Sequence, residues 1–275
     1  MRSRYLTVLD RELHFTEWGD PARPKLVLWH GLARTGRDFD DLAGALAGRF
    51  HIIAPDTIGR GLSQWSPAPR KDYTLDFYSA LAAGLVDALG WARFDWVGTS
   101  MGGAIALRAG AGALKGRIRR LVLNDIGPEL NPLAIDRIRA YAGTPPRFAR
   151  VSELEAYFRT IYAPYGALTD AQWRRLTETS TRRLPDGAVT PHYDPAMAQQ
   201  FAHAPHDYDQ WPQFLALAMP ILCLRGAQSD LLLKDAAARM QTRHSGCVVR
   251  EIEGCGHAPA LNTPEQFKIV GDFLD

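Results

Sequence analysis

Short strand-like segments alternate with longer helix-like segments over most of this 275-residue chain. Short apolar runs predict buried strands, and apolar residues at helical spacing predict the helices between them. This alternation is typical of a mostly parallel sheet with helices on both faces. It therefore predicts an α/β fold, in which catalytic groups gather at the carboxyl edge of the sheet.

The expected elements follow from these patterns and from turn residues between them. An antiparallel hairpin is predicted at Tyr5–Leu9 and Glu12–Trp18, around Asp10-Arg11. Further strands are predicted at Lys25–Trp29, His51–Ala54, Phe94–Val97, Arg120–Asn124, Ile221–Arg225 and Cys247–Ile252. Helices are predicted at Asp38–Ala47, Leu75–Leu89, Ser100–Ala109, Lys234–Arg243 and from Pro264 onward. Together these segments predict an eight-stranded sheet.

The strand pattern stops between residues 128 and 217. Aromatic and charged residues and proline pairs dominate this stretch, and helices are predicted at Ser152–Tyr162 and Thr169–Thr179. We interpret 128–217 as a helical cap inserted after the sixth strand and lying over the sheet. Residues 1–127 and 218–275 would then form the core domain.

The composition excludes several classes of protein. The formal charge is +2, from 32 basic and 30 acidic residues, so no strong field favours nucleic acid or an anionic membrane. The N-terminal stretch lacks the apolar centre of a signal peptide, and no apolar run is long enough to predict a membrane span. Three cysteines argue against a disulfide framework, so a cytoplasmic location is expected. The oligomeric state stays open.

Ser100 is the candidate nucleophile. It lies in Gly98-Thr99-Ser100-Met101-Gly102, between a predicted strand and a predicted helix. A serine on so sharp a turn occupies strained backbone space, and Gly98 and Gly102 are needed because side chains there would collide with the turn. The helix that follows would direct its N-terminal amides at a developing negative charge.

Acyl transfer also needs two amides to bind the oxyanion. One is expected to be the N–H of Met101, directly after the nucleophile. The other is expected to be the N–H of Leu32, in the loop after the Lys25–Trp29 strand, where Gly31 permits a close approach of the backbone. His30 in the same loop is interpreted as a residue that braces the loop rather than as the catalytic base.

A serine hydroxyl needs a base to remove its proton and an acid to orient that base. His257, in the glycine-rich loop after the last strand, is the candidate base because it alone among the histidines has the right position in chain order. Asp230, after the Ile221–Arg225 strand, is the predicted acid. Asp125 is the alternative acid because it also follows a strand, but its ordinary role would be to brace the loop that leads into the cap.

These motifs resemble those of the α/β-hydrolase superfamily, specifically its members with a helical cap. The order Ser100, Asp230, His257 is similar to the nucleophile–acid–histidine order of that superfamily. His30-Gly31 resembles its oxyanion-loop motif, and residues 56–63 resemble its D-x-x-G-x-G-x-S turn. The resemblance covers the chain apart from the insertion, and it implies the α/β-hydrolase fold.

The resemblance implies a serine hydrolase that cleaves a small carboxylic ester or lactone through an acyl-enzyme. Hydrolysis of a C–C bond in a ring-cleavage product is one alternative, although Ala258 stands where such enzymes commonly have Trp after the histidine. A ligand-binding or receptor-like member of the fold with little turnover is the other. No cofactor and no metal are expected, since Cys247, Cys255 and His257 leave a structural zinc site one ligand short. The expected partner is the small-molecule substrate.

Overall fold

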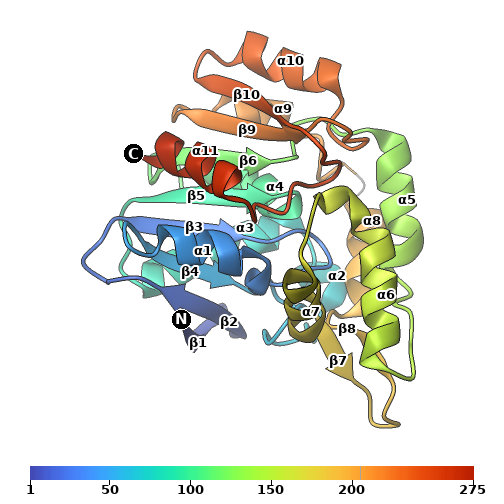
Figure 1. Cartoon of the computed structure of the whole chain (residues 1–275). Helices are drawn as coiled ribbons and strands as arrows, with labels where there is room; N and C mark the ends of the chain where they lie inside the picture. The colour runs from blue at the N-terminus through green and yellow to red at the C-terminus, as the bar shows by residue number, and fades with distance from the viewer. Residues whose placement is uncertain (205) are drawn as a thin grey trace.

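The computed structural model describes residues 1–204 and 206–275, apart from the side chain of Tyr141. An eight-stranded sheet with the order β1-β2-β4-β3-β5-β6-β9-β10 runs through the molecule (Figure 1). The strands are β1 (Arg2–Val8), β2 (Arg11–Trp18), β3 (Lys25–Trp29), β4 (His51–Pro55), β5 (Phe94–Thr99), β6 (Ile118–Asn124), β9 (Ile221–Gly226) and β10 (Cys247–Ile252). Only the pairs β1–β2 and β2–β4 are antiparallel, so the predicted mostly parallel sheet is confirmed.

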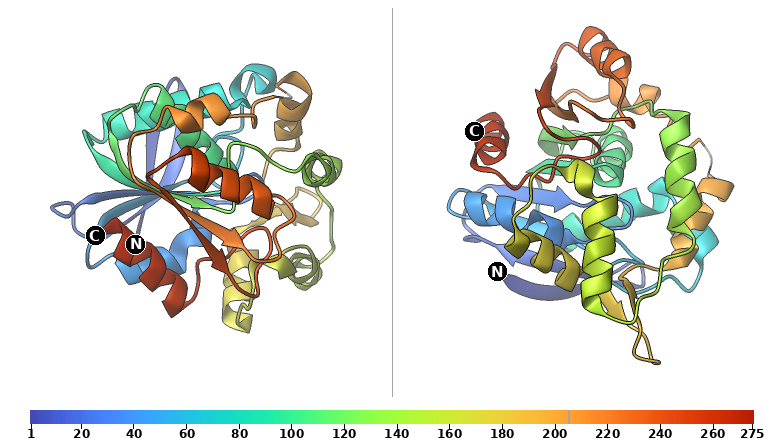
Figure 2. Two further views of the ribbon diagram at one scale, coloured as in Figure 1. Left: turned by 90° about the horizontal axis from the view of Figure 1, so that it is seen from above. Right: turned by 45° about the vertical axis from the view of Figure 1, so that its right-hand side comes forward.

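Helices cover both faces of this sheet, as Figure 2 shows from above. They are α1 (Asp40–Leu46), preceded by the short helix η1 (Gly36–Phe39), α3 (Leu75–Ala88), α4 (Met101–Ala111), α10 (Lys234–Arg243) and α11 (Pro264–Leu274). The one-turn helix α2 (Pro69–Asp72) lies between β4 and α3 in the chain. Side chains of α1 and α11 pack in one apolar cluster, and those of α3, α4 and α10 pack in another.

The strands contribute side chains to both apolar clusters, because successive side chains of a strand point to opposite faces of the sheet. On β5, Trp96 belongs to the cluster with α3 and α4, whereas the next residue, Val97, belongs to the cluster with α1 and α11. Trp96 stacks on Trp29 of β3, with ring centroids 5.1 Å apart. Burial on both faces fixes the register of β5, and therefore the place of the turn at Ser100 between β5 and α4, which we call the elbow.

The segment between β6 and β9 corresponds to the predicted insertion. It contains α5 (Pro132–Ala142), α6 (Val151–Ile161), η2 (Ala163–Tyr165), α7 (Asp170–Thr179), β7 (Thr181–Arg183), β8 (Val189–Pro191), η3 (Pro195–Gln199), α8 (Gln200–His203) and α9 (Trp211–Leu215). Helices α6 and α7 lie where the sequence predicts helices, and β7 and β8 add a short antiparallel hairpin that the sequence pattern does not reveal. In Figure 1, α5, α6 and α7 lie on the right, beside one end of the sheet strands.

The described helices are all too short or too polar to cross a membrane.

Candidate active site

Ser100 stands on a strained turn between β5 and α4. Its φ of 51° and ψ of −118° put a residue with a side chain in a region that favours glycine. The flanking glycines agree with the steric expectation. A Cβ on Gly98 would lie 2.5 Å from the carbonyl carbon of Gly102, and one on Gly102 would lie 2.0 Å from the carbonyl oxygen of Trp29. Strand, turn and helix therefore hold the serine in one place.

Three side chains form a continuous hydrogen-bonded chain at this turn. Ser100 Oγ lies 3.0 Å from His257 Nε2, and His257 Nδ1 lies 2.7 Å from Asp125 Oδ2. Asp125 is fully buried at the end of β6. Its carboxylate also accepts hydrogen bonds from the amide of Gly226 and the hydroxyl of Ser229, at 2.9 and 2.6 Å. Three donors thus stabilise its charge and fix the orientation of the imidazole.

The predicted contact between Asp230 and His257 is wrong in this structure. Asp230 lines the cavity at this site and forms an ion pair with Arg137 of α5. Burial alone would raise the pKa of Asp230, but the hydrogen bond and charge of Arg137 outweigh it and lower that pKa. Asp125 occupies that place instead: it follows β6, the direct neighbour of β5, and its carboxylate lies beside His257 Nδ1.

The two predicted oxyanion donors flank the serine. Met101 is the first residue of α4, where the helix leaves its amides without partners in the helix. Leu32 lies in the loop after β3, and within the described residues neither amide donates to a protein acceptor. Gly31 is less constrained than expected, because a Cβ there would lie 3.6 Å from Ser100 Cβ, an ordinary contact.

His30 has the bracing role that its position suggested. Its Nε2 accepts a hydrogen bond from the amide of Thr57 at 2.9 Å, and its Nδ1 lies 2.6 Å from the carbonyl oxygen of Gly31. The ring is fully buried, and this burial lowers its pKa to about 4. A neutral His30 therefore ties the oxyanion loop to the turn after β4.

A cavity of about 530 Å³ opens in front of Ser100 and His257. The core supplies one wall, with Gly31, Leu32 and Arg34, and α6 supplies the facing wall. The facing side chains are Tyr157, Thr160, Ile161 and Tyr162. Arg34 is paired with Asp38, so the two walls together offer hydroxyl groups, apolar surface and a charge that already has a partner. Such a mixture suits a small polar organic molecule.

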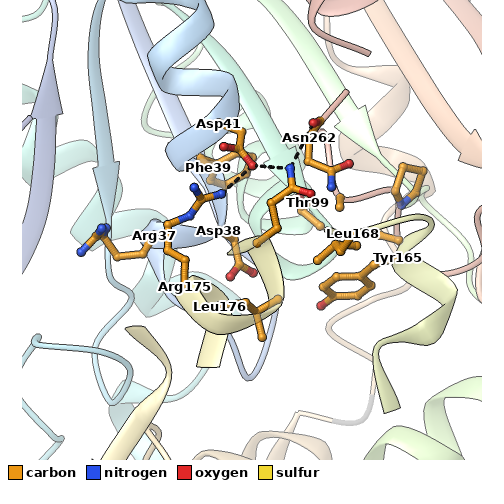
Figure 3. A pocket seen from close by; sticks show the side chains of 14 residues that line it. Arg37, Asp38, Phe39, Asp41, Thr99, Tyr165, Leu168, Arg175, Leu176 and Asn262 are labelled. Carbon is orange, nitrogen blue, oxygen red and sulfur yellow. Dashed lines mark hydrogen bonds and ion pairs between the residues drawn. The ribbon is translucent and has the colours of Figure 1, made fainter. Parts of the chain in front are cut away.

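A second, much smaller cavity of about 50 Å³ lies where α7 meets the core (Figure 3). Asp41 of α1 accepts hydrogen bonds there from Arg175 and Gln172 of α7, at 2.5 and 2.9 Å. Thr99 and Tyr165 line both cavities. This contact holds the inserted segment against the core next to the site.

The cysteines take up separate positions. Cys247 is buried in β10, and this burial raises its pKa to about 12. Cys255 donates a hydrogen bond to the carbonyl oxygen of Tyr165 at 3.5 Å. Among the residues that the structure describes, no three or more His, Cys, Asp or Glu side chains gather as a set of metal ligands.

The sequence favours Asp230 over Asp125 as the partner of His257, and no motif marks the pocket wall formed by α6. The available signal for Asp125 was its place directly after a buried strand, and Asp230 shared that signal. Neither the strand order nor the path of the loop after β9 is encoded in a local motif. The structure was needed to choose between the two carboxylates.

Comparisons with known proteins agree with this architecture. The Alpha/beta hydrolase family matches residues 26–268. The 3-hydroxybutyrate-oligomer hydrolase of Cupriavidus necator is 42% identical over 270 residues, which cover 94% of this chain and 92% of that protein. The 2-hydroxymuconate semialdehyde hydrolase of Pseudomonas sp. (strain CF600) is 30% identical over 83% of this chain and 78% of its own length. The crystal structure of an alpha/beta hydrolase from Novosphingobium aromaticivorans DSM 12444 superposes with a TM-score of 0.89, at 35% identity and covering 99% of this chain and 97% of that one. The chain therefore belongs to the alpha/beta hydrolase family.

Proposed function

We propose that this protein hydrolyses a carboxylic ester through an acyl-enzyme, with Ser100 as nucleophile, His257 as base and Asp125 as the acid that orients it. The observation that carries the proposal is the unbroken chain from Ser100 Oγ to His257 Nε2 and from His257 Nδ1 to Asp125 Oδ2, at 3.0 and 2.7 Å. These distances permit direct proton transfer from the hydroxyl to the imidazole.

In the first half-reaction, His257 Nε2 takes the proton of Ser100 while Oγ bonds to the carbonyl carbon of the ester. The carbonyl oxygen becomes an oxyanion and accepts hydrogen bonds from the amides of Leu32 and Met101. When the intermediate collapses, the ester C–O bond breaks and the imidazolium returns its proton to the departing alcohol. Water then attacks the acyl-enzyme by the same route and releases the acid and the free serine.

Asp125 acts on the histidine throughout this cycle. It accepts the Nδ1–H bond, which leaves Nε2 as the acceptor that faces Ser100. Its negative charge also stabilises the imidazolium that forms when the serine proton moves. The backbone amide of Gly226 and the hydroxyl of Ser229 keep the carboxylate from rotating away.

For the substrate, we propose a short linear ester of a 3-hydroxy acid. The similarity to a 3-hydroxybutyrate-oligomer hydrolase extends over nearly the whole of both chains, so it includes the segment that forms the facing wall. A cavity of about 530 Å³ has room for a small oligoester, and hydroxyl groups on its wall, from Tyr157, Thr160 and Tyr162, suit ester and hydroxyl oxygens.

Cleavage of a C–C bond is the second candidate, because the chain is also similar to a 2-hydroxymuconate semialdehyde hydrolase. Both reactions need the same serine and histidine, so the site alone does not choose between them. A parallel assay with a dienoic ring-cleavage product distinguishes the two. We expect faster turnover of the 3-hydroxybutyrate dimer and trimer.

The decisive test is Ser100→Ala, assayed with the 3-hydroxybutyrate dimer and a short p-nitrophenyl ester. We expect kcat to fall by about 10³-fold or more, since removal of a triad member removes nucleophilic catalysis. A fluorophosphonate probe should label the wild type at Ser100 and leave the variant unlabelled. Turnover by Ser100→Ala at the wild-type rate would rule out the proposal.

The chain offers a matched control in a second Ser–His–Asp arrangement. Ser3 Oγ lies 2.7 Å from His14 Nε2, and His14 Nδ1 lies 2.8 Å from Asp56 Oδ2. Ser3, however, lies within the extended strand β1 instead of at a helix N-terminus, so it lacks the amides that the elbow supplies to Ser100. We expect Ser3→Ala to keep wild-type turnover and wild-type labelling.

A further inference from the structure

Arg60 is a buried cation behind the proposed oxyanion hole. It lies in the turn after β4, and its side chain is fully buried. Its Nε donates to the carbonyl oxygen of Leu32 at 2.8 Å, and its Nη2 lies 3.6 Å from Met101 Sδ. One guanidinium thus contacts both residues whose amides are the proposed oxyanion donors.

The remaining contacts of Arg60 are to neutral groups. Nη1 donates to the carbonyl oxygen of Ile58 and to the hydroxyl of Tyr78, both at 2.8 Å. Nη2 also lies 3.1 Å from Met197 Sδ, in the inserted segment. Within the part of the chain that the structure describes, the hydrogen-bond partners of this guanidinium are all uncharged, and none is a carboxylate.

A buried charge without a direct counter-charge is costly to keep. Compensation is indirect, from aromatic rings: the guanidinium carbon lies 5.2 Å from the ring centroid of Tyr78. The guanidinium carbon lies 5.5 Å from the ring centroid of Tyr73, whose hydroxyl donates to Asp194 Oδ2 at 2.5 Å. A neutral side chain of similar length would fill the same space without this desolvation cost, so the charge itself calls for an explanation.

We propose that Arg60 is a positioning residue for the oxyanion hole, which fixes the loop of Leu32 and the side chain of Met101 and places a permanent positive charge behind their amides. This inference rests on the proposed acyl transfer by Ser100. The charge interacts weakly with the neutral ester and strongly with the tetrahedral oxyanion, because the intervening protein has a low effective dielectric constant. Its contribution is therefore specific to the transition state.

The test compares Arg60→Met, which keeps the length and loses the charge, with Arg60→Lys, which keeps the charge and loses the fork. For Arg60→Met we expect kcat to fall by about 10- to 100-fold, less than the loss typical of a direct oxyanion donor, with KM within about threefold of wild type. The affinity for a boronic acid that mimics the tetrahedral intermediate should fall in proportion to kcat. Arg60→Lys should recover part of both losses.

Arg108→Met is the matched control. Arg108 belongs to α4 and binds Asp207 and Gln210 of the inserted segment, so its loss loosens that segment without touching Leu32 or Met101. We expect its kcat and boronic acid affinity to stay within about threefold of wild type. An equal loss in Arg108→Met would assign the effect to the seating of the segment and overturn the inference.

The remaining outcomes are also decisive. A folded Arg60→Met enzyme with wild-type kcat and boronic acid affinity would refute the role of the charge. Should Arg60→Met fail to fold, Arg60→Lys decides on the positioning role of the guanidinium fork: a kcat loss of about twofold or more at constant KM supports it, and a smaller loss refutes it. Failure of the proposed function itself would be seen separately, as a wild-type enzyme that the fluorophosphonate does not label at Ser100.

Discussion

Asp125 combines two duties that usually fall to separate residues. Its φ of 54° turns the backbone sharply after β6, and its amide donates to the carbonyl oxygen of Leu224 at 2.7 Å. Its side chain binds the loop after β9 through Gly226 and Ser229 while it also accepts from His257. The bracing role expected of this residue is therefore present together with the contact to the base, because one buried carboxylate has enough lone pairs for all three donors.

The two carboxylates near His257 give opposite expectations on substitution. For Asp125→Asn we expect kcat to fall by about 10³- to 10⁴-fold, because an amide in this place favours the wrong imidazole tautomer. For Asp230→Asn we expect a change below about tenfold, since Asp230 is half-exposed and bound to Arg137. Steady-state kinetics on both purified variants checks this. A larger loss in Asp230→Asn would return the acid role to Asp230.

The candidate site was predictable where its chemistry is local. Ser100 is marked by flanking glycines between a strand and a helix, and His257 by its loop after the last strand. The choice between Asp125 and Asp230 depended on which loop reaches the imidazole, and that follows from packing between distant segments. Arg60 lies inside a recognised turn motif, but its burial and its bonds to Leu32 come only from the fold.

At the scale of elements, the strand–turn–helix of β5 and α4 is a rigid unit with little space for change. Helix α4 passes so close to β3 that the carbonyl of Trp29 occupies the space that a Cβ on Gly102 would need. The indole of Trp96 in turn donates to the carbonyl oxygen of Gly102 at 3.2 Å. Backbone atoms surround this position, so no flexible side chain can give way.

Gly102→Ala should therefore destabilise the protein by about 3 kcal/mol or more, because its Cβ would overlap backbone atoms. Gly44→Ala is the control. Gly44 lies inside α1, and no neighbouring atom comes within 4 Å of the place that an alanine Cβ would take. Alanine there should raise the free energy of unfolding by about 0.5–1 kcal/mol through helix propensity. Urea unfolding of both variants measures these effects. Equal stability of the two would contradict the steric account of the elbow.

Strands and helices were predicted correctly where an apolar run, or apolar residues at helical spacing, extended over enough residues to stand out from the neighbouring sequence. The strand Lys25–Trp29 and the helix Lys234–Arg243 have the bounds that the pattern predicts. β7 and β8 were missed because each has three residues, too few for alternation to stand out. Their pairing in an antiparallel hairpin depends on residues on both sides of a turn, not on one apolar run.

At the scale of the whole molecule, the site lies between two parts of the chain that are tied together at several points. Asp41 binds Arg175 and Gln172 beside the smaller cavity, and Arg60 binds Met197 of the inserted segment at a second point. A backbone hydrogen bond from the amide of Gly61 to the carbonyl oxygen of His192 adds to the second contact. Core stability and pocket shape are therefore coupled.

The burial of His30 in the core makes the global stability sensitive to the ionisation of this residue. Its folded pKa of about 4 lies below the ordinary value of 6.5, because burial disfavours the cation. Above pH 6.5 the ring is neutral in both states. Between pH 6.5 and 4 only the unfolded state takes up the proton, so the free energy of unfolding should fall with pH by up to about 3 kcal/mol from this group. Urea unfolding across this range gives the free energy of unfolding at each pH. Its dependence on pH should be weaker in His30→Gln than in wild type. Replacement of the exposed His203 by Gln should leave the pH dependence unchanged. Identical pH dependence in wild type and His30→Gln would contradict the assignment to His30.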